Sequence, residues 1–257
     1  MQKLSIRSSG RRLDVQREGQ LVFEVLQAGG VALCPNAVGY GIWGGSEASA
    51  KRIHAVKQRG AHKRNALLTD AVGQREVHVL DVVQQDMIEC VTVDYGVPLG
   101  VVAPYRADHP LLRNLSAEML AASTLEGTIS ILRNGGNLRD EVGRRAREAG
   151  LPIFGSSANL TGKGTRFRLE DVPPELRDLA DIEVDHGLSR HQLYRRSATI
   201  INFTNMSVVR FGSCFELVAD ILKRHFGIAL SADPDPLDPP IRIPAAATPA
   251  HASHHLA

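Results

Sequence analysis

Two stretches of the sequence carry side chains that could bind phosphate groups, and the first is the basic run from Lys57 to Arg64. Four fixed positive charges fall within these eight residues, around Gly60. Arginine presents a planar fork of donors and lysine a mobile point charge, so the run could clamp a polyphosphate. It could equally be a solvated face whose cations complement the C-terminal end of a helix. The run by itself does not separate these two interpretations.

The second stretch extends from Gly155 to Gly164 and follows four mostly apolar residues, 151–154, which predict a short buried strand. Its glycines let the backbone turn and approach a ligand closely. Neutral donors and acceptors come from Ser156, Ser157, Asn159 and Thr161, and Lys163 adds a positive charge. Such a loop at the end of a rigid strand suits a phosphate or a nucleotide. The alternative is an ordinary surface turn, which favours the same residue types.

Helices and strands upstream must hold the basic run in place. Apolar residues at helical spacing before Gly29 predict a helix over 14–28. Residues 31–34 predict a buried strand that enters a second turn-rich junction at 35–41. Ser46 is suited to cap a helix that ends near position 58 and turns Ala50, Ile53 and Val56 inward. The basic run therefore begins at a helix end.

The rest of the chain alternates between strand and helix patterns. Strands are expected at 97–104, 127–133, 198–203 and 208–211, and helices at 110–124, 137–149 and 215–226, with a short helix and strand around 176–182. The last two strands could form a hairpin around Asn205. Residues 77–83 and 90–93 are rich in β-formers, although the first segment also suits a helix. This interleaving predicts an α/β fold with a twisted mixed sheet.

Composition restricts the class of protein. The 257 residues include 43% hydrophobic and 23% charged residues, and the formal net charge is only +2, so any anion site must be local. The three cysteines lack metal-ligand spacing, and no segment has the pattern of a membrane span or a signal peptide, which indicates a cytoplasmic protein with reduced thiols. We expect a flexible N-terminus over 1–12, one domain over 13–228 and a disordered Pro/Ala/His tail over 229–257.

Several short motifs follow one another along the chain. They are a strand leading to Tyr-Gly at 31–41, a Lys-x-Arg with a further lysine at 57–63, a strand ending in arginine at 127–133, a Ser-x-Asn followed by Thr-Gly at 156–162, a late Ser-Thr strand at 197–201 and an Arg-x-Gly at 209–212. Their order resembles that of the YrdC-like family, which includes threonylcarbamoyl-adenylate synthases and the related domain of carbamoyl-transferring maturation factors. The resemblance covers roughly residues 20–226. It implies a single YrdC-like domain whose twisted mixed sheet, flanked by helices, carries a concave basic cavity.

The resemblance also implies a reaction. In the family, ATP, threonine and bicarbonate give threonylcarbamoyl-adenylate and pyrophosphate, an intermediate for modifying adenosine 37 of some transfer RNAs. By this resemblance, the candidate catalytic residues are Lys57 and Arg59, the candidate ATP- and phosphate-binding residues are Lys57, Arg59, Lys63, Ser157, Asn159, Ser197 and Arg210, and the candidate acceptor-binding residues are Asn36, Tyr40 and Arg133. Mg²⁺ would accompany the triphosphate, held mainly by phosphates and water, because no carboxylate pair marks a protein metal cage.

The chain departs from the family pattern on the acceptor side. Pro35-Asn36-Ala37-Val38 replaces the usual Pro-Thr-Asp-Thr, and Arg133-Asn134-Gly135 replaces the usual Arg-x-Pro. A site built on polar groups cannot simply accept their loss, so the acceptor could be threonine or another small amine. The alternative is a non-catalytic module that binds a nucleotide, double-stranded RNA or transfer RNA. The assignment depends on one spatial condition, that the turns near positions 60 and 158 face one cavity.

Overall fold

The computed structural model describes residues 3–7, 12–58 and 64–230. The strands are β1 (Leu4–Arg7), β2 (Val31–Asn36), β3 (Gly39–Gly44), β4 (Ala66–Leu67), β5 (Leu99–Pro104), β6 (Thr124–Leu125), β7 (Thr128–Arg133), β8 (Phe154–Ser157), β9 (Ile182–Asp185), β10 (Thr199–Asn202) and β11 (Ser207–Arg210). The helices are α1 (Val15–Gln27), α2 (Glu47–Lys57), α3 (Ala71–Val77), α4 (Val82–Glu89), α5 (Ala117–Ser123), α6 (Asn137–Glu148), α7 (Pro174–Leu179) and α8 (Phe215–Phe226), with a π-helix at Cys90–Asp94 and 3₁₀ turns at Leu169–Asp171 and Gln192–Tyr194.

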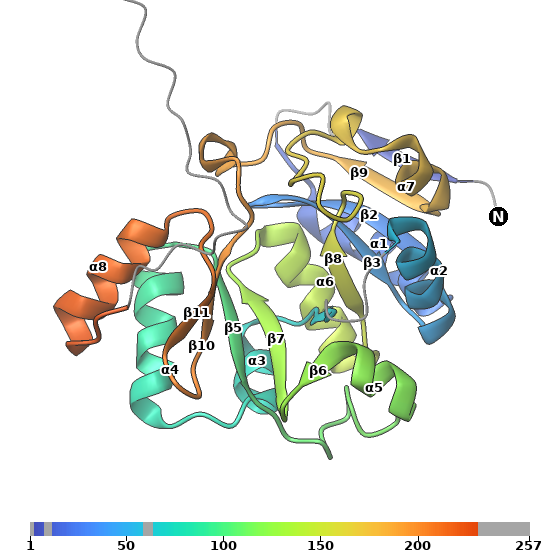
Figure 1. The fold of residues 1–257 in the computed structure, drawn as a ribbon. Coiled ribbons are helices and arrows are strands. Elements are labelled where there is room, and N and C mark those ends of the chain that lie inside the picture. The colour runs from blue at the N-terminus through green and yellow to red at the C-terminus, as the bar shows by residue number, and fades with distance from the viewer. Residues whose placement is uncertain (1–2, 8–11, 59–63, 231–257) are drawn as a thin grey trace, which may run out of the picture.

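One mixed sheet runs through the described part of the chain (Figure 1). Its strands lie in the order β1-β9-β2-β3-β8-β4-β7-β5-β10-β11, and β6 pairs with β7. The β1–β9, β2–β9, β4–β7 and β5–β10 pairs are parallel, whereas the β2–β3, β3–β8, β4–β8, β5–β7 and β10–β11 pairs are antiparallel. This arrangement confirms the predicted α/β class and the hairpin around Asn205.

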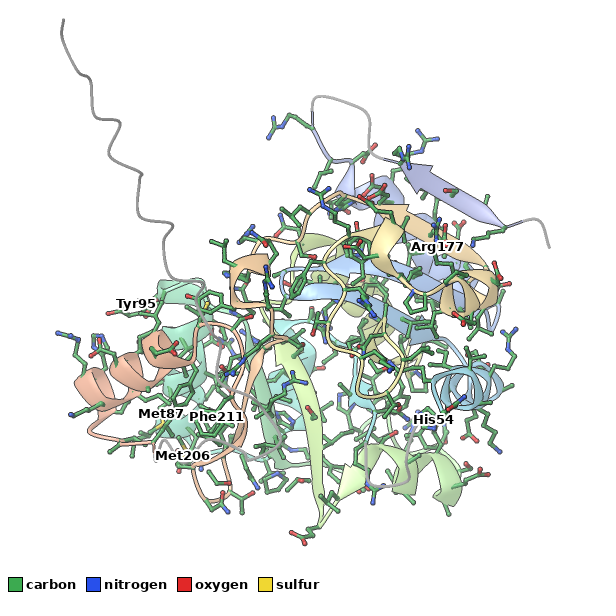
Figure 2. The ribbon with its side chains drawn as sticks, turned by 45° about the horizontal axis from the view of Figure 1, so that its top comes forward. His54, Met87, Tyr95, Arg177, Met206 and Phe211 are labelled. Atoms are coloured by element: carbon green, nitrogen blue, oxygen red, sulfur yellow. The ribbon has the colours of Figure 1, made fainter. Side chains whose placement is uncertain are left out.

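Helices cover both faces of the sheet, as neighbouring strand residues show. Ala32 packs with α1 and α6, whereas Leu33 packs with α2 and α7. Successive residues of a strand point to opposite faces, so these two pairs of helices lie on opposite sides. At the other end of the sheet, α4 and α8 pack on Leu99, Val101 and Ile201 (Figure 1). Figure 2 shows Met87 of α4 and Met206 of the β10–β11 turn in this second region, away from α2.

The helix that precedes the basic run begins and ends as the sequence predicts. Ser46 caps α2 by accepting a hydrogen bond from the backbone N–H of Ser49, and the Oγ of Ser49 accepts one from the backbone N–H of Ser46. Such reciprocal capping satisfies backbone donors that a helix start otherwise leaves unpaired. Ala50 and Ile53 are buried. The helix stops because Gln58 adopts a left-handed conformation with φ of 49°, which turns the chain into the basic run.

Several segments differ from the sequence predictions. We expected residues 1–12 to be flexible, but Leu4–Arg7 form β1, which pairs with β9 across 178 positions of sequence at Leu4 and Ile182. Residues 90–93 were expected to be extended, but they form the π-helix that continues α4. A third difference is that β8 begins at Phe154 and includes Gly155, so the polar loop starts three residues later than expected. The helix expected over 110–124 forms only at Ala117–Ser123, and residues 39–41, expected in a turn-rich junction, belong to β3.

The described residues extend the domain slightly beyond its predicted C-terminal boundary. Ile228 and Leu230 pack against the cluster that contains α4 and α8, so the domain extends to at least position 230 rather than 228. The expected disordered tail beyond this point lies outside the described residues, as do Arg59 and Lys63. Over the ranges that are described, no helix combines the length and apolar character needed to cross a bilayer. The three cysteines are free.

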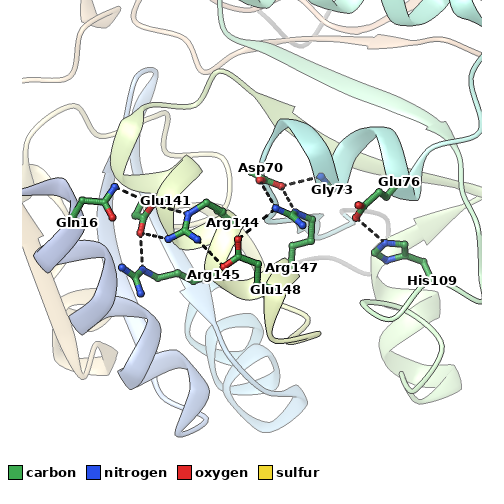
Figure 3. A network of polar contacts seen from close by, with 10 residues as sticks. All are labelled: Gln16, Asp70, Gly73, Glu76, His109, Glu141, Arg144, Arg145, Arg147 and Glu148. Atoms are coloured by element: carbon green, nitrogen blue, oxygen red, sulfur yellow. Dashed lines mark hydrogen bonds and ion pairs between the residues drawn. The ribbon is translucent and has the colours of Figure 1, made fainter.

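The charged helix α6 is held by ion pairs rather than being a simple solvent-exposed face (Figure 3). Glu141 accepts hydrogen bonds from Arg144 and Arg145, at 2.8 and 2.7 Å. The Nε of Arg147 donates to Asp70, the N-cap of α3, over 3.0 Å. Asp70 also caps α3 through the backbone N–H of Gly73. The network therefore ties the C-terminal turn of α6 to the start of α3.

Candidate functional site

A cavity of about 250 Å³ opens on one face of the sheet. Its floor consists of small residues in neighbouring strands: Gly155 of β8 pairs with Ala66 of β4, and Ala66 pairs with Ser130 of β7. Two positions further along β7, Leu132 pairs with Gly100 of β5. Paired residues point to the same face, so this part of the sheet carries little side-chain volume. The space above it is large enough for part of a nucleotide-sized ligand.

Trp43 of β3 forms one wall, and two glycines make room for it. A Cβ atom on Gly41 would lie 2.7 Å from Nε1 of Trp43, and one on Gly155 would lie 2.6 Å from its Cδ1. Both distances are shorter than a carbon contact allows, so any larger residue would displace the indole. Trp43 is the single tryptophan of the sequence, so its fluorescence can report on the cavity.

The two predicted turns meet at Lys57. This residue ends α2, is 3% exposed and lines the cavity. Its Nζ donates a hydrogen bond to the carbonyl of Ser157, and its own carbonyl accepts one from the Thr161 hydroxyl over 2.9 Å. For the described residues, the start of the basic run and the Ser-x-Asn loop therefore face one cavity, as the sequence predicts.

The other end of the basic run is also anchored near the cavity. His54, labelled in Figure 2 on α2, donates from Nε2 to the Oδ1 of Asn65 over 2.6 Å. Asn65 is buried and precedes β4, whose Ala66 lies in the cavity floor. Arg64 lines the cavity. The positions of Arg59 and Lys63 lie outside the described residues, so their roles remain predictions.

Asn159 presents an acceptor toward the same region. The residue is 8% exposed, and its Nδ2 donates to the carbonyl of Leu160 over 2.7 Å. The Oδ1 atom is buried and has no hydrogen-bond partner among the residues that the structure describes. A buried acceptor without a donor costs free energy, so this atom is suited to accept a hydrogen bond from a bound molecule.

The remaining predicted phosphate-binding residues also line the cavity. Ser197 precedes β10, and Arg210 ends β11. The guanidinium of Arg210 is held by the carbonyl of Ala198, which accepts from Nε over 3.0 Å and from Nη2 over 2.8 Å. These two hydrogen bonds to one carbonyl fix the orientation of the Arg210 guanidinium where it lines the cavity.

The predicted acceptor-binding residues have different positions. Asn36 and Tyr40 line the cavity. The Tyr40 hydroxyl is occupied, because it interacts with the carboxylate of Asp185 at 3.1 Å and the carbonyl of Gly187 at 3.0 Å. Burial and the adjacent Asp185 carboxylate raise the pKa of Tyr40 above its usual value, so the phenol stays neutral. The Tyr40 ring packs with Leu33 and Ile42 in the core on the α2–α7 side. Asn36 offers a buried Oδ1 without a partner in the described chain.

Arg133 does not line the cavity, and its position does not support the prediction that it binds the acceptor. Side chains alternate along β7, so Ser130 and Leu132 face the cavity and Arg133 faces the opposite side. There its guanidinium donates to Gln74, Glu89 and Thr92, each at 3.4 Å. Burial lowers the pKa of Arg133. This arginine belongs to the packing of α3 and α4 on the sheet.

Arg139 of α6 also lines the cavity, although no sequence motif predicted it. It is 3% exposed, and burial lowers its pKa to about 10, still well above neutrality. The described residues that line the cavity include four cations and no acidic side chain; the cations are Lys57, Arg64, Arg139 and Arg210. An excess of one charge in a concave site favours an anionic ligand.

Protein groups that could hold a metal by themselves are not gathered here. Within the described ranges, no group of three or more His, Cys, Asp or Glu side chains is placed to bind a metal ion. The donors that line the cavity suit phosphate oxygens instead.

The Sua5/YciO/YrdC family model, described by the words "Telomere recombination", matches residues 24–212. No curated protein matches the chain. Among solved structures, the hypothetical protein smu.1377c from Streptococcus mutans UA159 is 18% identical, with a TM-score of 0.72 over 90% of this chain and 98% of that one. E. coli YciO is 17% identical, with a TM-score of 0.61 over 83% and 96% of the two chains.

A further similar structure is P. abyssi Sua5 complexed with L-threonine, which is 17% identical with a TM-score of 0.65. The match covers 90% of this chain but 63% of that chain, so this chain spans less than two thirds of the length of P. abyssi Sua5. At these identities the three structures establish a shared fold. A shared fold does not determine the chemistry of the cavity, which depends on the residues that line it.

Proposed function

Because the chain belongs to the Sua5/YciO/YrdC family, we propose that it uses ATP to form a carbamoyl- or acyl-adenylate with release of pyrophosphate. The acceptor would be threonine or another small amine, carbamoylated from bicarbonate. The observation that carries the proposal is the cation set around the Ser157–Asn159 loop, in a cavity whose described lining has no acidic residue. Attack on the α-phosphate requires such cations, because negative charge gathers on phosphorus and on the departing pyrophosphate.

Each part of the cavity would have a distinct task. Lys57 would neutralise phosphate charge from a fixed position, since its Nζ is already oriented by the Ser157 carbonyl. The backbone and hydroxyls of the loop would hold phosphate oxygens, and Asn159 Oδ1 would accept a hydrogen bond from the nucleotide. Mg²⁺ carried by the triphosphate would supply further neutralisation of phosphate charge. Holding the carbamate in line with the α-phosphate would lower the entropic part of the barrier.

Support for an amino-acid acceptor comes from one similar structure. P. abyssi Sua5 was solved in complex with L-threonine, and this chain shares its fold. The segment 35–38 here carries one amide and no hydroxyl or acid. We therefore propose the reaction class for this chain and leave the acceptor as a small amine. A threonylcarbamoyl-adenylate product would serve modification of adenosine 37 in transfer RNA.

A pyrophosphate-release assay tests the proposal. The protein is incubated with ATP, Mg²⁺, bicarbonate and a panel of amino acids, and pyrophosphate is measured for the wild type and for Lys57→Met. Release that depends on bicarbonate and on one amino acid, and that falls sharply in Lys57→Met, is expected. Release no higher than in Lys57→Met for every acceptor would exclude the enzymatic function.

A second candidate function follows from the altered segment at Asn36–Val38. A relative that has lost acceptor recognition could retain the basic cavity as a binding module for a nucleotide, for double-stranded RNA or for transfer RNA. RNA binding through many phosphates would show a steep dependence on salt concentration. Filter binding at two salt concentrations separates the candidates: a steep salt slope without pyrophosphate release favours the module.

A further inference from the structure

A row of polar side chains on one face of α2 leads from the start of the helix toward the basic run. Glu47 accepts hydrogen bonds from the backbone N–H and the hydroxyl of Ser116, the N-cap of α5, over 2.8 and 2.7 Å. One turn later, Lys51 pairs with Glu118 of α5 at 2.7 Å. His54 follows after a further turn. Residues at this spacing share one face of a helix, so His54 continues the row that the two contacts with α5 begin.

The contact that His54 makes differs from the other two because it involves a buried residue. Asn65 is 4% exposed, and its Oδ1 accepts from the Nε2 of His54 over 2.6 Å. The backbone N–H of Asn65 donates to the carbonyl of Ala122 over 3.0 Å, and its Nδ2 donates to the hydroxyl of Ser123 over 3.4 Å. These two bonds hold Asn65 against the end of α5 and direct its Oδ1 toward α2. A buried oxygen that loses its donor is costly, so this bond matters more than an exposed ion pair does.

The bond between His54 and Asn65 joins the two ends of the basic run. Lys57 lies one turn after His54 on α2, and Arg64 directly precedes Asn65. Both cations line the cavity, whereas His54 and Asn65 do not. A hydrogen bond outside the cavity therefore connects the backbone segments that carry two cations into it.

We propose that the hydrogen bond between His54 and Asn65 positions the two ends of the basic run for the phosphates of ATP. Its effect is to preset the separation of Lys57 and Arg64. The inference rests on the proposed function and extends it to two positioning residues outside the cavity. The Thr161 hydroxyl also holds the end of α2, but it ties Lys57 to the Ser-x-Asn loop and not to Arg64. Preset cations favour binding of a polyphosphate because little conformational freedom is lost when it binds.

Calorimetric titration of two His54 variants with MgATP tests the proposal. His54→Leu removes the donor and leaves the buried Oδ1 of Asn65 unpaired, so the Kd for MgATP should rise about five- to tenfold, the worth of one hydrogen bond. His54→Gln carries an amide N–H that can take the place of the Nε2–H, so its Kd should stay within about twofold of the wild type. Equal losses of affinity in the two variants would overturn the proposal, because the hydrogen bond would then not be what matters.

Ser116→Ala is the matched control, because it breaks the contact at the other end of the row. It removes the hydroxyl that donates to Glu47 and that caps α5 by accepting from the backbone N–H of Met119. This variant should lower the free energy of unfolding in urea and bind MgATP within about twofold of the wild type. A merely structural role for His54 would give the same pattern in His54→Leu, a lower stability with unchanged affinity, and that pattern would overturn the proposal.

A measurement without ATP distinguishes this proposal from the proposed function. Lysines are acetylated with an N-hydroxysuccinimide ester, and peptide mass spectrometry compares Lys57, which is 3% exposed, with Lys51, whose side chain is 58% exposed. Labelling of Lys57 relative to Lys51 should rise about five- to tenfold in His54→Leu and stay unchanged in Ser116→Ala, because only the first change frees the end of α2.

The two proposals therefore fail in different ways. A wild type that neither binds MgATP nor releases pyrophosphate, with increased labelling of Lys57 in His54→Leu, would remove the reaction and retain the positioning of Lys57. Normal pyrophosphate release with an unchanged labelling ratio and an unchanged KM for ATP in His54→Leu would retain the reaction and remove the positioning role of His54.

Discussion

Replacing Lys57 by methionine tests whether the cavity binds the phosphates of ATP. Lys57 is the last residue of α2, is 3% exposed, and donates from Nζ to the carbonyl of Ser157. Methionine keeps most of the side-chain volume and removes only the charge and the donors. The change therefore isolates the electrostatic part of the site.

The expected magnitude follows from the contact that Lys57 would make. A hydrogen bond between a charged group and its partner is worth about 1.5–3 kcal/mol. At about 1.4 kcal/mol per factor of ten, the dissociation constant for MgATP should rise roughly 10- to 150-fold. The free energy of unfolding should change little, within about 1 kcal/mol, because loss of the bond to Ser157 is offset by no longer burying an ammonium group.

Isothermal titration calorimetry with MgATP measures this effect, and Lys51→Met provides the control. Lys51 lies on the same helix, but its side chain is 58% exposed and pairs with Glu118 at the surface. The two variants carry the same change in net charge, so general electrostatic attraction of ATP should fall equally in both. Only Lys57→Met should lose a direct contact.

A folded Lys57→Met protein that binds MgATP within threefold of the wild type would refute the placement of the phosphates. An equal loss of affinity in Lys51→Met would do the same, because it would show that net charge alone determines binding. A matching unfolding transition in urea establishes that the variants are folded.

Three further changes test the packing around the cavity. His78 is buried, its pKa is lowered to about 4 by burial, and its Nε2 donates to the Ile129 carbonyl, so the native state binds a proton less readily than the unfolded chain. Wild-type stability should therefore be intact above pH 6.5 and fall by up to about 3 kcal/mol relative to His78→Gln as pH drops toward 4, measured by urea unfolding at several pH values. Gly155→Ala places a Cβ 2.6 Å from Trp43, so it should cost about 1–3 kcal/mol and shift the Trp43 emission spectrum. Arg133→Met should lower the free energy of unfolding by about 1–2 kcal/mol, because bonds of 3.4 Å to Gln74 and Glu89 are lost while Glu89 keeps its ion pair with Arg75 at 2.9 Å, and the MgATP affinity measured by calorimetry should be unchanged.

Sequence patterns predicted α1, α2, α5, α6, α7, α8 and most strands because these elements have local causes, whereas α3 and α4 were not predicted. The apolar stripe of α1, the Ser46 cap of α2 and the apolar face of α8 are all contained within one element. The π-helix at Cys90–Asp94 could not be predicted, since β-branched Val91 and Val93 favour a strand. There Val91 packs against the α8 side of the core, and Thr92 donates to the Ile88 carbonyl over 2.7 Å. These tertiary and local contacts override the strand propensity of the two valines.

The site was predictable to the extent that motifs lie at the ends of elements. Lys57 ends α2 and the Ser-x-Asn loop follows β8, so both positions follow from where the elements stop. The prediction that failed is that Arg133 of β7 binds the acceptor. A shift of one residue along a strand moves a side chain to the other face of the sheet. Sequence alone could not show that Leu132 faces the cavity and Arg133 does not. Arg139 lies on a helix whose other arginines form ion pairs, so nothing in its local pattern marked it.

The small residues of the cavity floor explain why no single motif encodes this site. Gly155, Ala66 and Ser130 are far apart in sequence but lie in register across three strands, and Gly100 continues the floor on a fourth. Each is unremarkable alone, because a small residue in a strand usually only weakens packing. Together they remove side-chain volume from one face, and Lys57 at the end of α2 and Arg139 in the first turn of α6 line the space that is left. The position of the cavity is therefore a property of strand register, and the chemistry inside it is a property of the helix ends.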